Sequence, residues 1–223
     1  MKKTMNIAID GPAGAGKSTI ARKVAKNNGY IYVDTGAMYR AMALFFIREN
    51  IKANQEKQIE EAAGKVDISI QYTDGEQVVL LNGENVNAFL RTEEVGNMAS
   101  ATSSYGAVRK KLQELQKKLA DTSDVVMDGR DIGTAVLPDA QVKIYLTASS
   151  RVRAERRYKE LVEKGEKADL GQIEADIIDR DHRDMTRKLN PLTKADDAVL
   201  VDSSDMTIEE VTARIDEVIQ QAK

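Results

Sequence analysis

The feature that most constrains this chain is a glycine-rich stretch close to the start of its sequence. The stretch reads Gly11-Pro12-Ala13-Gly14-Ala15-Gly16-Lys17-Ser18-Thr19. It matches the G-x-x-x-x-G-K-[ST] pattern of a phosphate-binding loop. The apolar residues 5–9 before it are typical of a buried strand, and residues 19–25 after it have the spacing of one helix face. A chance match in a glycine-rich turn is the alternative, but the strand–loop–helix context favours the phosphate loop.

The residue types of this stretch suit a bound triphosphate. Its three glycines let the backbone adopt conformations that a Cβ would hinder, so that N–H groups can approach phosphate oxygens. The helix that follows directs the partial positive charge of its N-terminus at the anion. Lys17 is expected to reach the β- and γ-phosphates, and Ser18 is expected to ligate Mg²⁺. We therefore predict that residues 11–19 bind ATP together with Mg²⁺.

Composition excludes several other classes of protein. The 223 residues are 42% hydrophobic and 31% charged, which suits a sizeable core and a solvated surface. A net charge of −3 argues against a general binder of nucleic acids or membrane surfaces. The lack of cysteine and the single His182 exclude disulfides, thiolate metal sites and multi-histidine zinc sites. No apolar run approaches 18 residues and no signal peptide precedes the first strand, so a cytoplasmic location is predicted.

A second predicted strand ends at a group of polar residues. Residues 30–33 read as this strand and residues 38–50 as the helix that follows, which places Thr35, Tyr39 and Arg40 at the strand end. Strand ends in open α/β sheets are where ligands bind, so these three side chains are expected to meet a substrate. Simple packing for Tyr39 and a solvated helix position for Arg40 are the alternatives.

Another polar group follows the apolar residues 125–127. Asp128 there suits a Walker-B-like carboxylate that approaches Mg²⁺ directly or through water. Arg130 and Asp131 come next and are expected to project into the same crevice. Residues 141–147 supply a further strand of the predicted α/β fold.

The alternation of strands and helices is interrupted between residues 66 and 87. Residues 66–72 alternate apolar with polar side chains, residues 77–81 read as a second strand, and Asn82-Gly83 is a strong two-residue hairpin signal. The sequence therefore predicts a small antiparallel sheet inserted into a parallel core. Residues 91–121 then read as helical, with an apolar stripe at Val108, Leu112, Leu115 and Leu119.

The last third of the sequence contains two arginine-bearing sets with helical spacing. One set recurs at i, i+3 and i+4 and the other at i, i+4 and i+7, so each lies on one helix face. The sets are Arg153, Arg156 and Arg157, and Arg180, Asp184 and Arg187. Solvated charged faces, or intrahelical salt bridges of about 0.3–0.5 kcal/mol, are the alternatives. The phosphate loop in the same chain favours a mobile arginine flap and a phosphate clamp.

The chain closes with a predicted strand at residues 198–201 and a helix. Thr207 and Glu210 have the spacing of a capping box at the start of this helix. Its predicted buried stripe consists of Ile208, Val211, Ile215, Val218 and Ile219.

Together these features resemble the nucleoside monophosphate kinases, and most specifically the bacterial cytidylate kinases. The resemblance extends over essentially the whole chain and includes residues 11–19, 34–40, 128–134 and 180–187, and the hairpin insert. It implies a three-layer P-loop kinase fold with a five-stranded parallel sheet, an inserted antiparallel monophosphate-binding subdomain and a helical lid. The implied boundaries are 1–40, 106–150 and 185–223 for the P-loop core, 41–105 for the monophosphate-binding domain and 151–184 for the lid.

The resemblance also implies roles for individual side chains. The implied cytosine readers are Ser100, Arg109 and Asp131. The implied ribose and nearby contacts are Thr35, Arg180 and Asp184, and the strand-end argument adds Tyr39 and Asp128 to the substrate-binding residues. The implied monophosphate clamp is Arg40, Arg130 and Arg187. The expected catalytic group is Lys17, Arg130 and the two lid arginines Arg153 and Arg157. The expected metal ligands are Ser18 and Asp128.

The implied reaction is transfer of the γ-phosphate of ATP to CMP or dCMP, giving CDP or dCDP, in pyrimidine nucleotide metabolism. No apolar surface stripe is left over after the predicted core is assigned, which favours a monomer. Another P-loop small-molecule kinase, of the UMP/CMP or shikimate type, is the alternative. A GTPase switch needs an Asn-Lys-x-Asp guanine reader, which the sequence lacks. A nucleic-acid-dependent ATPase needs a broad basic surface, which the net charge disfavours.

Overall fold

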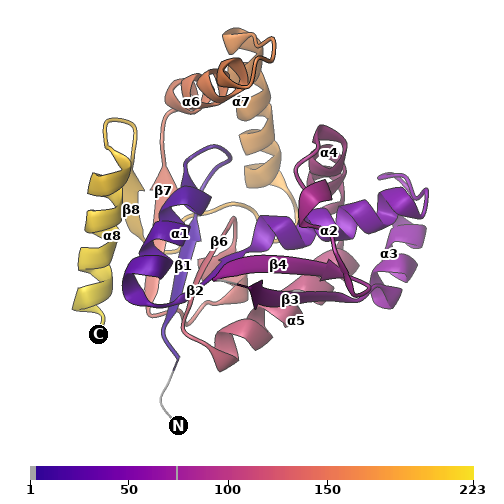
Figure 1. Ribbon diagram of the computed structural model, residues 1–223, viewed down its shortest axis with the longest axis horizontal. Helices are drawn as coiled ribbons and strands as arrows, with labels where there is room; N and C mark the ends of the chain where they lie inside the picture. The colour runs from indigo at the N-terminus through magenta and orange to yellow at the C-terminus, as the bar shows by residue number, and fades with distance from the viewer. Residues whose placement is uncertain (1–3, 74) are drawn as a thin grey trace. The chain divides into compact units, whose positions relative to one another are not determined.

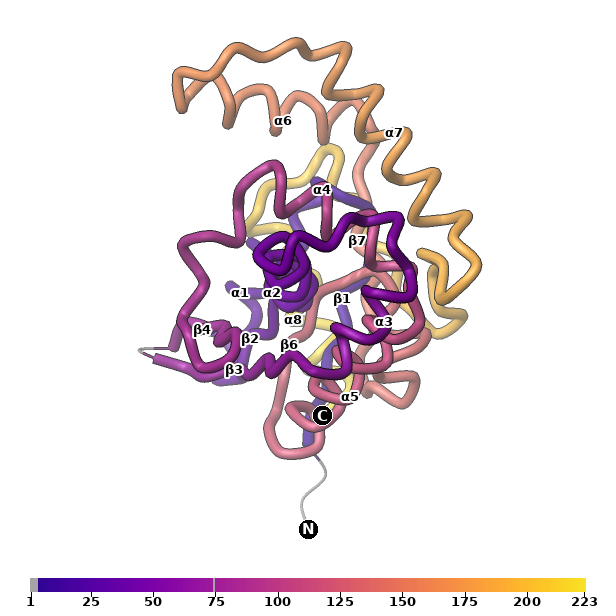
Figure 2. Tube along the Cα trace, turned by 90° about the vertical axis from the view of Figure 1, so that its right-hand side faces the viewer, coloured from indigo at the N-terminus to yellow at the C-terminus, as the bar shows by residue number. Residues whose placement is uncertain are grey.

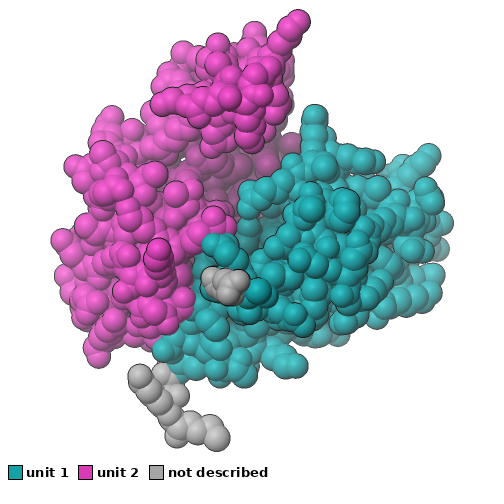
Figure 3. All heavy atoms as spheres, in the orientation of Figure 1, with its two compact units in different colours: residues 1–4, 31–125 teal, residues 5–30, 126–223 magenta. Residues whose placement is uncertain are grey.

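The computed structural model describes residues 4–73 and 75–223. The chain forms two compact units, which Figure 3 shows in different colours. We call residues 5–30 and 126–223 the phosphate-loop unit, and residues 1–4 and 31–125 the hairpin unit. Among the described residues, no helix combines the length and the apolar character needed to cross a membrane.

A five-stranded sheet has the strand order β2-β6-β1-β7-β8. Its strands are β1 (Asn6–Asp10), β2 (Ile31–Asp34), β6 (Val125–Gly129), β7 (Val142–Thr147) and β8 (Val199–Asp202). β7 pairs in parallel with both β1 and β8, which sets Ile144 opposite Ile9 and Val199. The apolar runs 7–9 and 125–127 are fully buried, as expected for strands covered on both faces. The predicted α/β fold with a five-stranded parallel sheet is confirmed.

The phosphate-loop unit holds four helices. α1 (Lys17–Asn28) packs against α8 (Ile208–Gln221), while α6 (Ser150–Glu163) and α7 (Leu170–Thr186) lie side by side (Figures 1 and 2). A single π-helical turn, η2 (Ile132–Val136), follows β6. The helices α6 and α7 bury few side chains, as their dense charge predicts.

Helix α8 confirms one prediction and corrects another. Thr207 and Glu210 form the expected capping box, with each side chain bonded to the backbone of the other. Val211, Ile215 and Ile219 are buried, but Ile208 is 47% exposed and does not belong to the core stripe. Ile208 is the first residue of the helix, so no preceding turn supplies side chains to flank it.

The hairpin unit contains a second, antiparallel sheet of order β3-β4-β5, which confirms the predicted insert. In its first strand pair, Ile68 faces Leu81 and Tyr72 faces Gln77. The remaining elements of the unit are α2 (Thr35–Arg48), α3 (Glu56–Lys65), β3 (Ile68–Thr73), β4 (Glu76–Leu81), β5 (Glu84–Asn85), η1 (Asn87–Phe89), α4 (Glu93–Thr102) and α5 (Gly106–Thr122).

Two predicted helix boundaries in this unit were wrong. Helix α2 begins at Thr35 rather than at residue 38, because the Asp34 carboxylate caps it by accepting a hydrogen bond from the N–H of Ala37. The single helix predicted over residues 91–121 is two helices, α4 and α5, separated by residues 103–105.

Candidate active site

The phosphate loop connects β1 to α1, and its backbone requires glycine. Gly11 has a φ of +149°, and a Cβ there would lie 1.9 Å from the carbonyl oxygen of Leu146 in β7. Gly14 and Gly16 have φ values of +75° and +83°, in the left-handed region that favours glycine. The loop therefore packs closely against β7 and adopts a backbone conformation that is unfavourable for residues other than glycine.

The N-terminus of α1 fits an anion. Gly16 occupies the N-cap position, and no side chain of the described residues caps the helix there. The first N–H groups of a helix lack intrahelical partners and have a partial positive charge. The loop and this helix end together have the donor set of a phosphate site.

Lys17 is a buried cation, 6% exposed. Its Nζ donates a hydrogen bond to the carbonyl oxygen of Pro12, at 2.7 Å. Burial and the nearby guanidinium of Arg130 lower the pKa of Lys17, although neighbouring carboxylates oppose them. An anion at this position would stabilise the charged form of Lys17, so the loop favours a polyanionic ligand.

Ser18 and Asp128 meet at the end of β6. The Ser18 hydroxyl donates a hydrogen bond to Oδ2 of the buried Asp128, at 2.8 Å. The described residues contain no cluster of three or more histidine, cysteine, aspartate or glutamate side chains suited to a metal ion. This oxygen pair fits Mg²⁺, which in nucleotide sites takes one or two protein oxygens and completes its shell with water and phosphate.

Asp10, the last residue of β1, is a site residue that was not predicted from the sequence. This buried carboxylate accepts hydrogen bonds from the N–H groups of Ile132 (2.8 Å) and Gly133 (2.7 Å). Burial raises the pKa of Asp10 to about 6, although these two hydrogen bonds oppose the shift. Asp10 thereby fixes the turn that follows Asp131. An acid that ends an apolar strand directly before a phosphate loop was the available signal.

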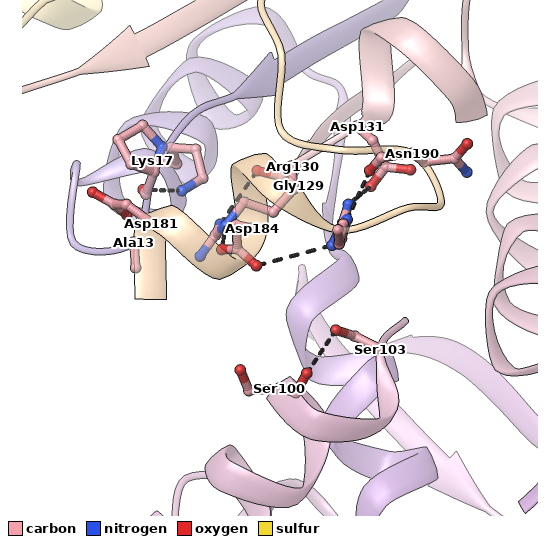
Figure 4. Close-up of polar contacts among 12 residues, drawn as sticks. Ala13, Lys17, Ser100, Ser103, Gly129, Arg130, Asp131, Asp181, Asp184 and Asn190 are labelled. Atoms are coloured by element: carbon pink, nitrogen blue, oxygen red, sulfur yellow. Dashed lines mark hydrogen bonds and ion pairs between the residues drawn. The ribbon is translucent and has the colours of Figure 1, made fainter. Parts of the chain in front are cut away.

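Four predicted substrate-binding residues come together in the phosphate-loop unit. Arg130 Nε pairs with Asp184 Oδ2 at 2.8 Å, and Arg187 Nη2 pairs with Asp131 Oδ1 at 3.1 Å (Figure 4). Arg187 Nη1 also lies 3.9 Å from Asp184 Oδ1, and Arg187 Nε donates a hydrogen bond to the carbonyl oxygen of Asn190. The end of α7 is thus tied to the segment that follows β6.

The neighbouring arginines determine the ionisation of Asp184. Burial alone would raise the pKa of Asp184, but the guanidinium groups of Arg130, Arg180 and Arg187 outweigh it and lower that pKa. Asp184 is therefore an anion that holds cations in place. With Arg180 included, the cluster has three guanidinium groups and two carboxylates. This excess of positive charge suits a phosphate with an adjacent sugar.

Arg153 is buried rather than projecting into solvent. Its Nε donates to the carbonyl oxygen of Ala148 at 2.9 Å, and its Nη1 donates to that of Ala13 in the phosphate loop at 2.8 Å. Its Nη2 pairs with Asp181 of α7 at 2.7 Å. Arg153 therefore braces the phosphate loop against α6 and α7.

The other two arginines of α6 differ in exposure. Arg157 is exposed and pairs with Glu160 at 3.2 Å. Arg156 donates to the carbonyl oxygen of Ser203 at 2.7 Å, which anchors α6 to the loop after β8. The predicted charged face of α6 thus contains one anchor and one exposed cation.

The hairpin unit gathers its own group of predicted residues. The Arg109 guanidinium, 2% exposed, lies 5.7 Å from the centre of the Tyr39 ring. Arg109 Nη1 donates to the carbonyl oxygen of Ser103 at 3.0 Å, and the Ser103 hydroxyl donates to that of Ser100. Residues of α2, α4 and α5 that are far apart in sequence therefore lie close together.

The first turns of α2 hold the remaining two predicted residues. Thr35 is buried in the first turn. A Cβ at Gly36 would lie 3.2 Å from both the Arg40 guanidinium and the Asp34 carboxylate. The lack of a side chain at residue 36 therefore leaves room for Arg40 beside the cap of the helix.

A parallel sheet, a glycine loop with a buried lysine and a serine–aspartate pair at a neighbouring strand end define a nucleotide-binding protein of the P-loop kinase class. The solved structure of a gluconokinase from Sinorhizobium meliloti 1021 has the same fold, with a TM-score of 0.50 and 14% identity over 100% of this chain and 95% of that chain.

Sequence comparison identifies the family. The family described as cytidylate kinase matches residues 7–221. The chain is 51% identical over 213 residues to the cytidylate kinase of Caldicellulosiruptor saccharolyticus, covering 96% of this chain and 94% of that relative. It is 49% identical over 217 residues to the cytidylate kinase of Lactobacillus johnsonii, covering 97% and 94%. The chain belongs to the cytidylate kinase family.

Proposed function

We propose that this protein transfers the γ-phosphoryl group of ATP to CMP or dCMP and releases ADP with CDP or dCDP. The supporting observation is full-length membership of the cytidylate kinase family together with a phosphate loop whose lysine and Ser18–Asp128 pair are in place. We further propose that the chain acts as a cytoplasmic monomer. We also propose that residues 1–40, 106–150 and 185–223 form the core, residues 41–105 the monophosphate-binding domain and residues 151–184 the lid.

The reaction needs neutralisation of charge more than it needs a base. The acceptor phosphate is already anionic near neutral pH, so the protein has to hold two polyanions in line. Two unit charges 4 Å apart repel by about 4 kcal/mol at an effective dielectric constant of about 20. We assign Lys17 to the donor phosphates, and Arg40, Arg130 and Arg187 to the acceptor phosphate.

ATP would supply the transferable phosphoryl group, and a bound Mg²⁺ would neutralise part of the triphosphate charge. We assign Ser18 and Asp128 to hold the Mg²⁺. Residues 11–19 would hold the triphosphate through backbone N–H groups and the end of α1. Asp128 follows the apolar residues 125–127 near the end of β6, where a divalent cation would compensate its buried charge.

The proposed selectivity for cytosine rests on the pattern of hydrogen-bond donors and acceptors of this base. Asp131 is proposed to accept a hydrogen bond from the N4 amine, and Ser100 and Arg109 are proposed to contact the base from the hairpin unit. Uracil presents an oxygen in place of that amine and would leave Asp131 without its donor. An unsatisfied buried polar group costs about 1–3 kcal/mol, so UMP is expected to be a poor acceptor.

The remaining assignments concern the sugar and the lid. Thr35, Tyr39, Arg180 and Asp184 are proposed to lie around the ribose and its surroundings. Arg153 already donates to the phosphate loop and to Asp181, so we propose that it positions the loop. Arg157 is exposed, and we propose that it reaches the transferring phosphoryl group when the α6–α7 pair closes over the nucleotides.

A panel of acceptors tests this function. The purified protein is incubated with ATP and Mg²⁺ and with CMP, dCMP, UMP, AMP, GMP or shikimate, and ADP release is followed by a coupled assay. We expect the highest kcat/KM with CMP or dCMP. A higher kcat/KM with another acceptor would contradict the proposal and would identify the substrate class instead.

A further inference from the structure

One side chain of the inserted hairpin is bonded to the strand end that precedes the predicted acceptor residues. Oε1 of Gln77, in β4, accepts a hydrogen bond from the backbone N–H of Asp34 at 2.9 Å. Nε2 of the same side chain donates to the backbone carbonyl oxygen of Asp34 at 3.2 Å. A single side-chain amide therefore satisfies both backbone groups of one residue, as a neighbouring strand would.

A second side chain continues this contact along β2. The Tyr72 hydroxyl donates to the carbonyl oxygen of Tyr32 at 3.1 Å. Tyr32 and Asp34 are two residues apart, so their backbone groups point to the same edge of β2. Tyr72 and Gln77 are opposite each other in the β3–β4 pair. β2 is the terminal strand of the five-stranded sheet, so two paired hairpin residues cover its outer edge with side chains.

The residue held by Gln77 determines where α2 begins. Asp34 is the N-cap of α2 and accepts a hydrogen bond from the N–H of Ala37 through its own side chain. Thr35 and Arg40 follow within the first two turns. The Arg40 guanidinium and the Asp34 carboxylate both lie beside Gly36, close enough that a Cβ on residue 36 would be 3.2 Å from each. A displacement of Asp34 would therefore be passed on to the predicted ribose and phosphate contacts.

We propose that Gln77, supported by Tyr72, is a positioning residue for the nucleoside monophosphate: it fixes the start of α2 and thereby places Thr35 and Arg40. The inference rests on the proposed function, because it concerns the acceptor half of that reaction. It gives the inserted sheet a task in acceptor binding that needs no direct contact between the sheet and the substrate.

A merely structural role for Gln77 makes a different prediction. Ile68, Val79 and Leu81 form a buried apolar side of the hairpin, so the hairpin keeps its packing when the Gln77 amide is removed. Burial also raises the pKa of Tyr72, so its hydroxyl remains a donor at neutral pH. If Gln77 only stabilised the fold, its loss would lower the melting temperature and would leave the KM for each substrate unchanged.

The test compares Gln77→Ala and Tyr72→Phe with Gln71→Ala. Gln71 is the same residue type in the same hairpin, but it is exposed. We expect Gln77→Ala to raise the KM for CMP about tenfold, with the KM for ATP changed less than about twofold. Tyr72→Phe should act in the same direction with a smaller effect, and Gln71→Ala should match the wild type. In an Arg40→Ala background, Gln77→Ala should raise the KM for CMP less than it does alone.

Amide hydrogen exchange over residues 34–40 gives a readout independent of activity. Exchange should be faster in Gln77→Ala than in Gln71→Ala. The inference is overturned if exchange is unchanged, or if the KM values for CMP and ATP rise equally. The proposed function stands in either case, provided that the wild type converts CMP. If the wild type does not convert CMP at all, the proposed function fails, and the inferred role in acceptor binding fails with it even where exchange changes.

Discussion

The two units hold their candidate residues by different kinds of interaction. In the phosphate-loop unit, Arg130, Asp131, Asp184 and Arg187 are tied together by ion pairs between largely buried charges. In the hairpin unit, the start of α2 is held mainly through backbone groups: Gln77 makes neutral hydrogen bonds to the backbone of Asp34, and the Asp34 carboxylate caps the helix. Under the proposed function, the first unit neutralises phosphate charge, and the second positions the start of α2.

Removal of the buried loop cation should have the largest effect. We predict that Lys17→Met lowers kcat/KM about 100- to 1,000-fold, because a preorganised charge at the transferring group is lost. Lys23→Met is the matched control: Lys23 lies on the same helix but is partly exposed and pairs with Glu209. Steady-state kinetics with ATP and CMP measure both variants. Near-normal turnover in Lys17→Met would contradict the assignment of the loop.

The next effect concerns choice of base. Asp131→Ala should lower the ratio of kcat/KM for CMP to that for UMP by about 10- to 100-fold, which corresponds to the cost of one unsatisfied buried group. The variant should also lose stability, because Arg187 remains buried without this carboxylate. Asp139→Ala, at an exposed position, is the control. An unchanged CMP/UMP ratio would show that Asp131 does not select the base.

The buried charges of the phosphate-loop unit should also make stability depend on pH. The folded-state pKa of Asp10 is about 6, above its ordinary 3.8. Between these values the folded protein keeps a proton that the unfolded chain has lost, so the contribution of Asp10 to stability falls as pH rises. Relative to Asp10→Asn, which does not titrate, the wild type should lose roughly 1 kcal/mol of unfolding free energy between pH 5 and pH 7.

Urea unfolding of both proteins at several pH values measures this difference. Titratable groups remote from Asp10 contribute equally to both proteins and cancel. A difference that stays constant, or that grows in favour of the wild type as pH rises, would mean that Asp10 is ionised throughout this range.

The smallest effect should come from a charged pair of the hairpin unit. Arg48 and Glu84 form a bidentate ion pair, with contacts of 2.6 and 3.0 Å, on the exposed side of the unit. We predict that Glu84→Gln changes kcat/KM for CMP by less than about twofold, because exposed ion pairs contribute little. A larger loss would show that this unit also depends on charge and would weaken the comparison between the two units.

The parts of the fold that local sequence determines were predicted well. The phosphate loop depends on glycines within one short stretch, and the capping box depends on Thr207 and Glu210. The antiparallel sheet depends on alternating side chains and on the Asn82-Gly83 turn between β4 and β5. Each of these signals lies within a few residues of the structure that it specifies. The start of α2 was misplaced because the carboxylate of Asp34, the last residue of β2, was not recognised as the cap of the helix that follows.

The contacts that sequence reasoning missed join distant segments. Asp10 bonds to N–H groups more than 120 residues away, and Gln77 bonds to the backbone of a strand 43 residues earlier. Arg153 was predicted to be a lid arginine, but its bond to Ala13 depends on the tertiary contact between α6 and the phosphate loop. Such contacts follow from the tertiary arrangement, which periodicity and spacing do not encode.

The central claim is that the chain moves a phosphoryl group from ATP to CMP. The most direct test uses ATP labelled in its γ-phosphate, incubated with CMP, Mg²⁺ and the purified protein, and separates the products. The account predicts that the label appears in CDP, and that Lys17→Met forms little labelled CDP while Lys23→Met forms as much as the wild type. Label that appears only in inorganic phosphate, with CMP left unchanged, would contradict it.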